Sequence, residues 1–241
     1  MLHKSRGIVI HALKYSETSL VVKIYTEEFG LQSYIVKGAR SRKASISHNL
    51  FQPMTLLELV ISHKEGGGLQ HIREAGMAEP FHSLSSELRK RTIVLFLSEV
   101  LLKSLREDET NADLFEFLVS SMRFFDLQKK GVEFFHLYFL IHFSRYLGFF
   151  PQGEAIQTDS FFDLREGRFT VLKPAHPDFL DSRTGRLFAR LMTSRAVDLP
   201  DLPFSNTDRK DLLDALVLYY MIHQGGMGSI RSAEVLREVF R

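Results

Sequence analysis

A cluster of positive charges is the first feature of the sequence that could do chemistry. Residues 37–45 read KGARSRKAS and place four cations within seven residues, with no carboxylate among them: Lys37, Arg40, Arg42 and Lys43. Arginine binds phosphate oxygens through a planar fork, and lysine binds them as a point charge. Gly38 would let the backbone approach a phosphate closely. The segment therefore predicts an anion-binding loop, with an ordinary solvated surface as the alternative.

The charge distribution along the chain favours an anionic partner for the N-terminal end. The whole chain has a formal net charge of +2, whereas residues 1–45 contain eight Lys or Arg against three Glu, a local balance of +5. A basic end on a mildly acidic body is typical of a protein that binds a polyanion. Four more cations would extend the positive surface if the fold places them on one side: Lys4, Arg6, Lys14 and Lys23.

Motifs for catalysis and metal binding are missing from the sequence. The chain has no cysteine, so thiolate metal sites and cysteine nucleophiles are excluded. No GxSxG or HExxH motif occurs, and GGGL and GGMG lack the Lys-Ser/Thr of a phosphate-binding P-loop. The most obvious carboxylate pair, Asp108 and Glu109, falls in an expected solvated loop. We therefore predict that the protein is not an enzyme and uses no cofactor.

The ten histidines also fail to form a metal site. His136 and His142 are six residues apart on one expected helix and would point in different directions. His63 and His71 could approach each other across a hairpin, but two imidazoles without a third ligand make a weak site. We predict that no metal is bound.

The elements that must position the cations are short strands. Up to residue 80, apolar residues alternate with polar ones in five runs joined mostly by short turns: 8–12, 20–24, 31–37, 55–63 and 69–77. This pattern predicts a small barrel or sandwich, and an OB-type barrel is the commonest solution of this size. Gly30 suits the left-handed position of a hairpin loop. The longest gap between strands, from Gly38 to Thr55, contains the cations.

Three tyrosines of the same region, Tyr15, Tyr25 and Tyr34, could offer ring faces to nucleic-acid bases. The alternative is that they are ordinary strand aromatics with half-buried rings.

From residue 81 the apolar spacing becomes that of helices. The first predicted helix falls within 80–108, with Ser86 or Ser85 as N-cap, and it has one stripe of leucines: Leu84, Leu88, Leu95, Leu102 and Leu105. Further helices are expected at 111–127, with Asn111 or Thr110 as N-cap, and at 131–150, 182–194, 206–224 and 229–240. The second of these, 131–150, is apolar all round and should be buried. A hairpin is expected at 160–172, with its turn near Glu166 and Gly167.

The predicted fold is therefore α+β, with a five-stranded OB-fold barrel at residues 1–80 and an all-helical domain with a small hairpin insertion at 81–241. No apolar run approaches the roughly 18 residues that would span a bilayer, and the N-terminus does not have the pattern of a secretory signal. We expect a cytoplasmic protein with no membrane partner.

Four strings in the N-terminal half carry a resemblance to a known family. KYSETSL, YTEEFG, VKGARSRK and FQPMTLLEL occur in this order, and together they resemble the RecO family of recombination mediators. In that family a strand–SETS–strand hairpin leads through T-E-E-x-G to a K-G-A-R segment and a Q-P-x-T strand. The likeness continues more loosely through SEVLLKSL, LGFFP and SIRSAEVLREVF, so it covers nearly the whole chain.

The resemblance implies a function and a set of partners. Proteins of this family bind single- and double-stranded DNA, anneal complementary strands and act with RecR. They help a RecA-type recombinase load onto DNA coated with single-strand-binding protein, whose acidic, apolar-ended tail the helical domain is expected to receive. By position, Lys37, Gly38 and Arg40 match the K-G-A-R motif, and Arg42 and Lys43 match its basic continuation. Association with the nucleoid is implied as well.

The chain departs from the family at one site. Many members have a four-cysteine zinc site, whereas the corresponding region, about 151–177, has no cysteine here. The hairpin must then be held by packing, and we expect Phe161, Phe162 and Phe169 to do this.

Two other classes of function stay open. A protein-only adaptor would use the basic loop to bind an acidic partner and would not bind bare oligonucleotides. A metal-dependent nuclease would need clustered carboxylates on the basic face, but Glu17, Glu27 and Glu28 fall in turns without further acids nearby.

Overall fold

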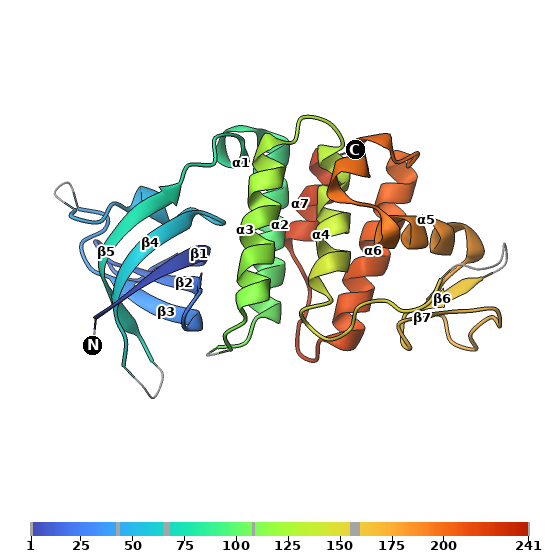
Figure 1. Cartoon of the computed structure of the whole chain (residues 1–241), viewed down its shortest axis with the longest axis horizontal. Coiled ribbons are helices and arrows are strands. Elements are labelled where there is room, and N and C mark those ends of the chain that lie inside the picture. Colours follow the sequence, from blue (N-terminus) through green and yellow to red (C-terminus); the bar gives the residue numbers. More distant parts are fainter. Residues whose placement is uncertain (1, 42–43, 65–67, 108, 155–159, 241) are drawn as a thin grey trace. The chain divides into compact units, whose positions relative to one another are not determined.

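The computed structural model describes residues 2–41, 44–64, 68–107, 109–154 and 160–240. The chain forms two compact units, Met1–Asp126 and Leu127–Arg241. Figure 1 shows strands gathered in the first unit and mostly helices in the second. In the described ranges, no helix combines the length and apolar character needed to cross a membrane.

Five strands of the first unit close into a barrel (Figure 1). They are β1 (Leu2–Lys14), β2 (Leu20–Thr26), β3 (Gly30–Val36), β4 (Leu56–Ser62) and β5 (Gln70–Glu79). The strand order is β1-β2-β3-β5-β4, with β4 pairing back to β1. All pairs are antiparallel except the short parallel pair of β3 with β5. The predicted five-stranded OB-fold barrel is confirmed.

The barrel core comes from the alternation in the sequence. Val9, Val22, Ile24 and Ile61 point inward and are completely buried, and Phe51 of the 3-10 helix η1 (His48–Phe51) joins them. Full burial of such a side chain contributes about 1.5–3 kcal/mol. Because every second residue faces inward, the residues between them must face outward and are available to contact a partner or the helices.

Two turns of the barrel need glycine. Gly30 has φ +61°, the left-handed value predicted for the hairpin between β2 and β3. Gly38, directly after β3, has φ +71°. A side chain would strain the backbone at both positions.

The helices of the first unit are α1 (Ser83–Ser86), α2 (Leu88–Ser104) and α3 (Ala112–Leu127). The helix predicted within 80–108 is interrupted, because Glu87 is extended and separates α1 from α2. The long part, α2, has Glu87 as its N-cap, the residue directly after the predicted caps Ser85 and Ser86. The expected leucine stripe is also wrong in part, since Leu88 and Leu95 are 59% and 48% exposed. The stronger stripe of Ile93, Phe96, Leu97, Val100 and Leu101 occupies a different face of α2 and is buried instead. The predicted cap of α3 is confirmed, because the side chain of Asn111 accepts the N–H of Leu114 at 2.9 Å.

The second unit contains α4 (Phe135–Phe143), α5 (Ser182–Thr193), α6 (Asn206–His223) and α7 (Ser232–Val239), with 3-10 helices η2 (Val132–Phe134) and η3 (Ala196–Asp201). The predicted burial of the central helix is confirmed, because seven residues of α4 are buried on all sides. The helix is shorter than predicted, since the chain turns after Phe143 and reaches Gly148 with φ +83°.

A small sheet lies in and beside the cysteine-free region 151–177. Its strands are β6 (Phe161–Asp163), β7 (Arg168–Thr170) and β8 (Phe179–Leu180), in the order β7-β6-β8. The predicted hairpin is confirmed, and β8 adds a strand that its two residues could not reveal in the sequence. Phe162 is completely buried, and its ring packs against those of Phe169, Phe188 and Tyr219. Aromatic packing therefore holds the hairpin, as expected, while Phe161 packs edge-on against Phe179.

Candidate nucleic-acid interface

The segment after β3 is anchored to the loop between β1 and β2. The backbone N–H of Arg40 donates to the carbonyl of Thr18 at 3.1 Å, and its guanidinium donates to the carbonyl of Glu17 at 3.3 Å. Ala39 is buried in the barrel core, and its carbonyl accepts the N–H of His48 at 3.0 Å. Lys37 and Arg40 themselves are exposed. The backbone of residues 39 and 40 is thus anchored, and Lys37 and Arg40 point to solvent.

Lys14 belongs to the same end of the barrel. It pairs with Leu20 across β1 and β2, and Leu20 pairs with Val36, the residue before Lys37. Lys14 is exposed, and so is the next residue, Tyr15, at 64%. Lys14, Lys37 and Arg40 are therefore brought to one end of the barrel. The remaining two predicted cations of the segment, Arg42 and Lys43, lie outside the described residues.

Arg6 and Lys23 are paired with glutamates. The guanidinium of Arg6 donates to Glu27 at 2.8 and 2.9 Å and also contacts Glu116 on α3. The hydrogen bond to Glu27 raises the pKa of Arg6, and the same bond lowers the pKa of Glu27. Lys23 contacts Glu107 at 2.9 Å. Both cations already have anionic partners, so they do not extend the positive surface around Lys37.

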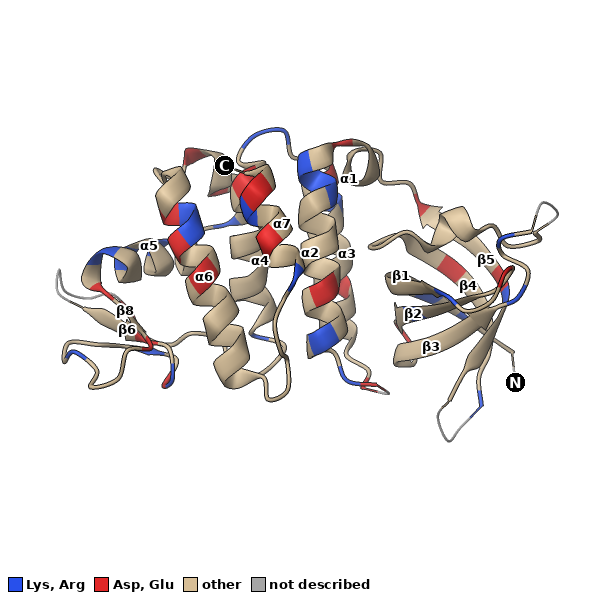
Figure 2. Ribbon diagram, turned by 180° about the vertical axis from the view of Figure 1, so that it is seen from behind, with Lys and Arg blue, Asp and Glu red and all other residues tan. Residues whose placement is uncertain are grey.

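Lys4 lies in an acidic groove. The groove crosses β1, β4 and β5 and is lined by Lys4 and Arg6 together with four glutamates: Glu27, Glu28, Glu58 and Glu74. Figure 2 shows the acidic residues on β4 and β5. A groove with this excess of carboxylates repels phosphate groups.

Two of the three tyrosines are buried, so the alternative interpretation, that they are strand aromatics and do not stack on bases, holds for Tyr25 and Tyr34. Tyr25 and Tyr34 are 1% and 0% exposed. Tyr25 stacks on Phe115 of α3 with ring centroids 6.3 Å apart, and burial raises the pKa of its hydroxyl to about 12. Tyr34 belongs to the barrel core. The sequence places Tyr25 at an outward position of β2, but it does not show that α3 covers this position.

A second groove contains Lys37 and one cation that the sequence did not predict, Arg73. The groove lies where β3 ends and β5 begins, and it is lined by Ile35, Val36, Lys37, Ser45, Ile46, His71, Ile72 and Arg73. The sequence does not single out Arg73, because Glu74 follows it and the two charges cancel. The signal that could have found it is the alternation of β5, which turns Arg73 outward while Ile72 is buried.

The histidines do not assemble in the described residues. His63 stacks on Phe29 with ring centroids 4.2 Å apart, and His71 pairs with Ser62 across β4 and β5. In the described ranges, no three His, Asp or Glu side chains are grouped so that they could hold a metal ion. Asp108 of the carboxylate pair lies outside these ranges. That the protein is no enzyme stays a prediction.

The fold and this end of the barrel define the chain as an OB-fold protein with a helical C-terminal region, whose loops at one end present cations. The family model described as recombination protein O N terminal matches residues 1–81, and recombination protein O C terminal matches residues 85–229. Several relatives named DNA repair protein RecO match over nearly their whole length. Those of Phocaeicola vulgatus and Azobacteroides pseudotrichonymphae are 35% and 31% identical over 240 residues, covering 100% of both chains. That of Flavobacterium psychrophilum is 37% identical over 239 residues, covering 98% of both. The chain belongs to the RecO family of DNA repair and recombination proteins.

Proposed function

We propose that this protein is a recombination mediator in DNA repair. It binds single- and double-stranded DNA, anneals complementary strands and helps load a RecA-type recombinase onto DNA coated with single-strand-binding protein. The observation that supports this is the anchored cationic loop after β3, in a chain of the RecO family. Annealing needs no covalent catalyst, because two strands need only be held close together with their repulsion screened.

The proposed DNA clamp is the segment after β3 together with Lys14. Arg40 binds phosphate oxygens through its fork, Lys37 acts as a point charge, and Gly38 allows the backbone to come close. Arg42 and Lys43 continue the clamp in the sequence. Such contacts give affinity without reading the base sequence. Lys4, Arg6 and Lys23 are left out, because glutamates already surround or neutralise them.

The helical region serves protein partners in this proposal. We infer a division at residue 80, with a DNA-binding domain at 1–80 and a partner-binding domain at 81–241. The partners are RecR and the acidic, apolar-ended tail of single-strand-binding protein, which needs an apolar pocket with a basic rim. Of the basic run at the start of α2, Arg89 and Arg91 are exposed but Lys90 is buried, so Lys90 cannot contribute to such a rim. The protein would work in the cytoplasm, on the DNA of the nucleoid.

Binding to a bare, labelled single-stranded oligonucleotide at moderate salt tests the proposal against the protein-only adaptor. We expect binding by the wild type, and a loss of affinity of about tenfold or more when Lys37 and Arg40 are both changed to Ala, because two charge-assisted contacts are removed. Lys4→Ala is the matched control and should leave binding unchanged. No binding by the wild type would instead favour an adaptor whose basic loop meets an acidic protein.

A further inference from the structure

The groove at the junction of β3 and β5 has the charge that a DNA strand requires. Its lining contains two cations, Lys37 and Arg73, and no carboxylate. The acidic groove on the same barrel contains four glutamates against two cations. Of these two grooves, the one beside the clamp is therefore suited to a polyanion.

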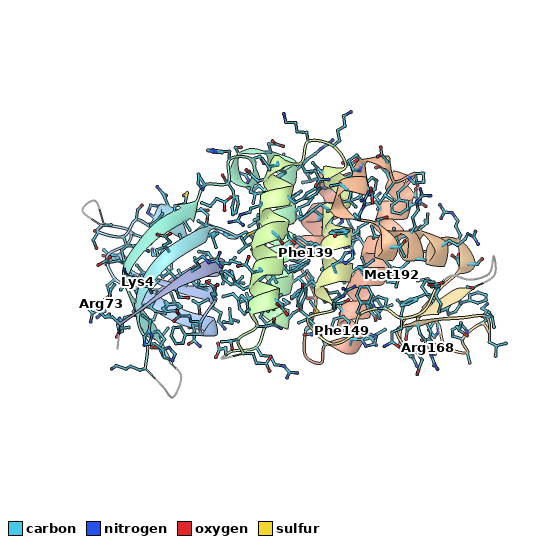
Figure 3. All side chains as sticks on the ribbon, in the orientation of Figure 1. Lys4, Arg73, Phe139, Phe149, Arg168 and Met192 are labelled. Atoms are coloured by element: carbon cyan, nitrogen blue, oxygen red, sulfur yellow. The ribbon has the colours of Figure 1, made fainter. Side chains whose placement is uncertain are left out.

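The strand pairing explains why the groove opens at this place. β3 and β5 pair over only two positions, Tyr34 with Gln70 and Ile35 with His71. Beyond Ile35 the chain leaves the sheet through the cationic loop while β5 continues. The side chain of Arg73 projects at the outer surface of the barrel (Figure 3).

The two cations have no competing partners in the part of the chain that the structure describes. Neither Lys37 nor Arg73 forms an ion pair or a side-chain hydrogen bond there. Arg6 and Lys23, in contrast, have carboxylates within 2.9 Å. Lys37 and Arg73 can therefore bind an incoming phosphate without first giving up an internal ion pair.

The floor between the cations is apolar. Ile46 and Ile72 are each 9% exposed, Ile35 is half-buried, and the exposed imidazole of His71 lies at the edge. Phosphates bind cations, whereas the face of an unstacked base binds apolar and aromatic surfaces. An apolar floor flanked by two cations thus matches one nucleotide of a single strand. A duplex keeps its bases stacked inside and would leave this floor uncovered.

We propose that this groove is a nucleotide subsite for single-stranded DNA. Lys37 and Arg73 bind successive phosphates, and the base between them rests on Ile35 and Ile46 beside His71. The inference rests on the proposed DNA-binding function and extends the path of the strand from the loop onto β5. It assigns Arg73 and His71 to DNA binding.

The test measures binding of a labelled single-stranded oligonucleotide to the full chain by fluorescence anisotropy at several salt concentrations. We expect Arg73→Ala to weaken binding about tenfold and to make the log–log salt slope shallower by about 0.7, the value for one phosphate contact. Arg91→Ala is the matched control, because it removes the same charge from an exposed position on α2. Ser45→Glu, which adds a carboxylate at an exposed position of the groove, should weaken binding as well.

Three outcomes would overturn the inference. If Arg73→Ala and Ser45→Glu both bind like Arg91→Ala while the Lys37→Ala/Arg40→Ala variant binds weakly, the subsite is refuted and the clamp stands. If the loop variant is unaffected too, the proposed clamp fails together with the subsite. An equal loss for single-stranded and duplex DNA in Arg73→Ala would refute the assignment to a single strand.

The position of the base has its own test. An oligonucleotide with abasic sites keeps its phosphates and loses its bases. The wild type should bind the intact strand more tightly than the abasic one, and the effect of Arg73→Ala should persist with both. Equal binding of the two strands by the wild type would refute the contact between a base and the apolar floor.

Discussion

Asp126, near the end of α3, holds the start of α1 and a buried lysine in one hydrogen-bond network. Its carboxylate accepts the backbone N–H groups of His82, Ser83 and Leu84 at 3.1, 2.7 and 3.1 Å. Lys90 is 1% exposed, and its ammonium donates to the hydroxyl of Ser83 and to the carbonyl of Asp126, both at 2.8 Å. The N–H groups at a helix start have no partner within the helix, so the Asp126 side chain supplies one from a distant part of the sequence.

We predict that Asp126→Ala lowers the free energy of unfolding of the first unit by about 3 kcal/mol. Loss of a helix cap costs about 0.5–2 kcal/mol, and each hydrogen bond to a charged group contributes about 1.5–3 kcal/mol. The buried ammonium of Lys90 also loses a nearby negative charge. Lys90→Met should cost less, about 1 kcal/mol, because the side chain still fills the space and the three N–H groups keep their acceptor.

Urea unfolding of the full-length variants measures these costs. Asp113→Ala is the matched control, because Asp113 is an exposed carboxylate on the same helix and its loss should cost no more than about 1 kcal/mol. The double variant Asp126→Ala/Lys90→Met should be more stable than the sum of the single losses predicts, since no unpaired buried ammonium remains. Equal losses for Asp126→Ala and Asp113→Ala would refute the reasoning.

Three further predictions concern both units. Burial, together with the charge of Arg209, lowers the pKa of His136 to about 3. The stability that this residue contributes should therefore be full above pH 6.5 and should decrease by about 1.4 kcal/mol for each pH unit between pH 6.5 and pH 3. His136→Leu should reduce this slope in pH-dependent urea unfolding, and an unchanged slope would contradict the burial of a neutral imidazole. Gly30→Ala should cost about 2–4 kcal/mol by thermal or urea unfolding, because its Cβ would lie 2.2 Å from the carbonyl oxygen of Glu109 at a positive φ; a wild-type stability would show that this contact does not form. Phe162→Ala should cost about 3–5 kcal/mol, whereas a chelator should leave the melting temperature unchanged, and a chelator-induced drop would reveal a metal that holds the hairpin.

The sequence predicts the barrel well because its signals are local. Alternation of apolar residues identifies each strand, and Gly30 marks the hairpin turn. The cations of the loop are equally visible, because no carboxylate neighbours them in the sequence. Lys37 and Arg40 are exposed as this predicts.

Distant partners explain most of what the sequence does not predict. The ion pair of Lys23 with Glu107 joins residues 84 positions apart, and that of Arg6 with Glu116 joins residues 110 apart. No local pattern can tell a cation that is neutralised in this way from one that is free to bind phosphate. The cap at the start of α1 is another distant partner, because it comes from Asp126.

The groove at the β3–β5 junction was missed for a topological reason. Arg73 and Lys37 line the same groove because β5 returns beside β3, and this pairing covers only two positions. In addition, the negative charge of the next residue, Glu74, cancels that of Arg73 in any count of local charge. A single strand can therefore contribute to two grooves of opposite charge: β5 places Arg73 in this groove and Glu74 in the acidic one.

The salt dependence of single-stranded DNA binding tests the central claim most directly. The wild type is compared with a variant in which Lys37, Arg40, Arg42 and Lys43 are all changed to Ala. Each lost phosphate contact should reduce the log–log slope by about 0.7. The DNA clamp therefore predicts weaker binding and a slope shallower by about 3 in a variant that still unfolds cooperatively. Equal slopes and equal affinity for the two proteins would contradict it.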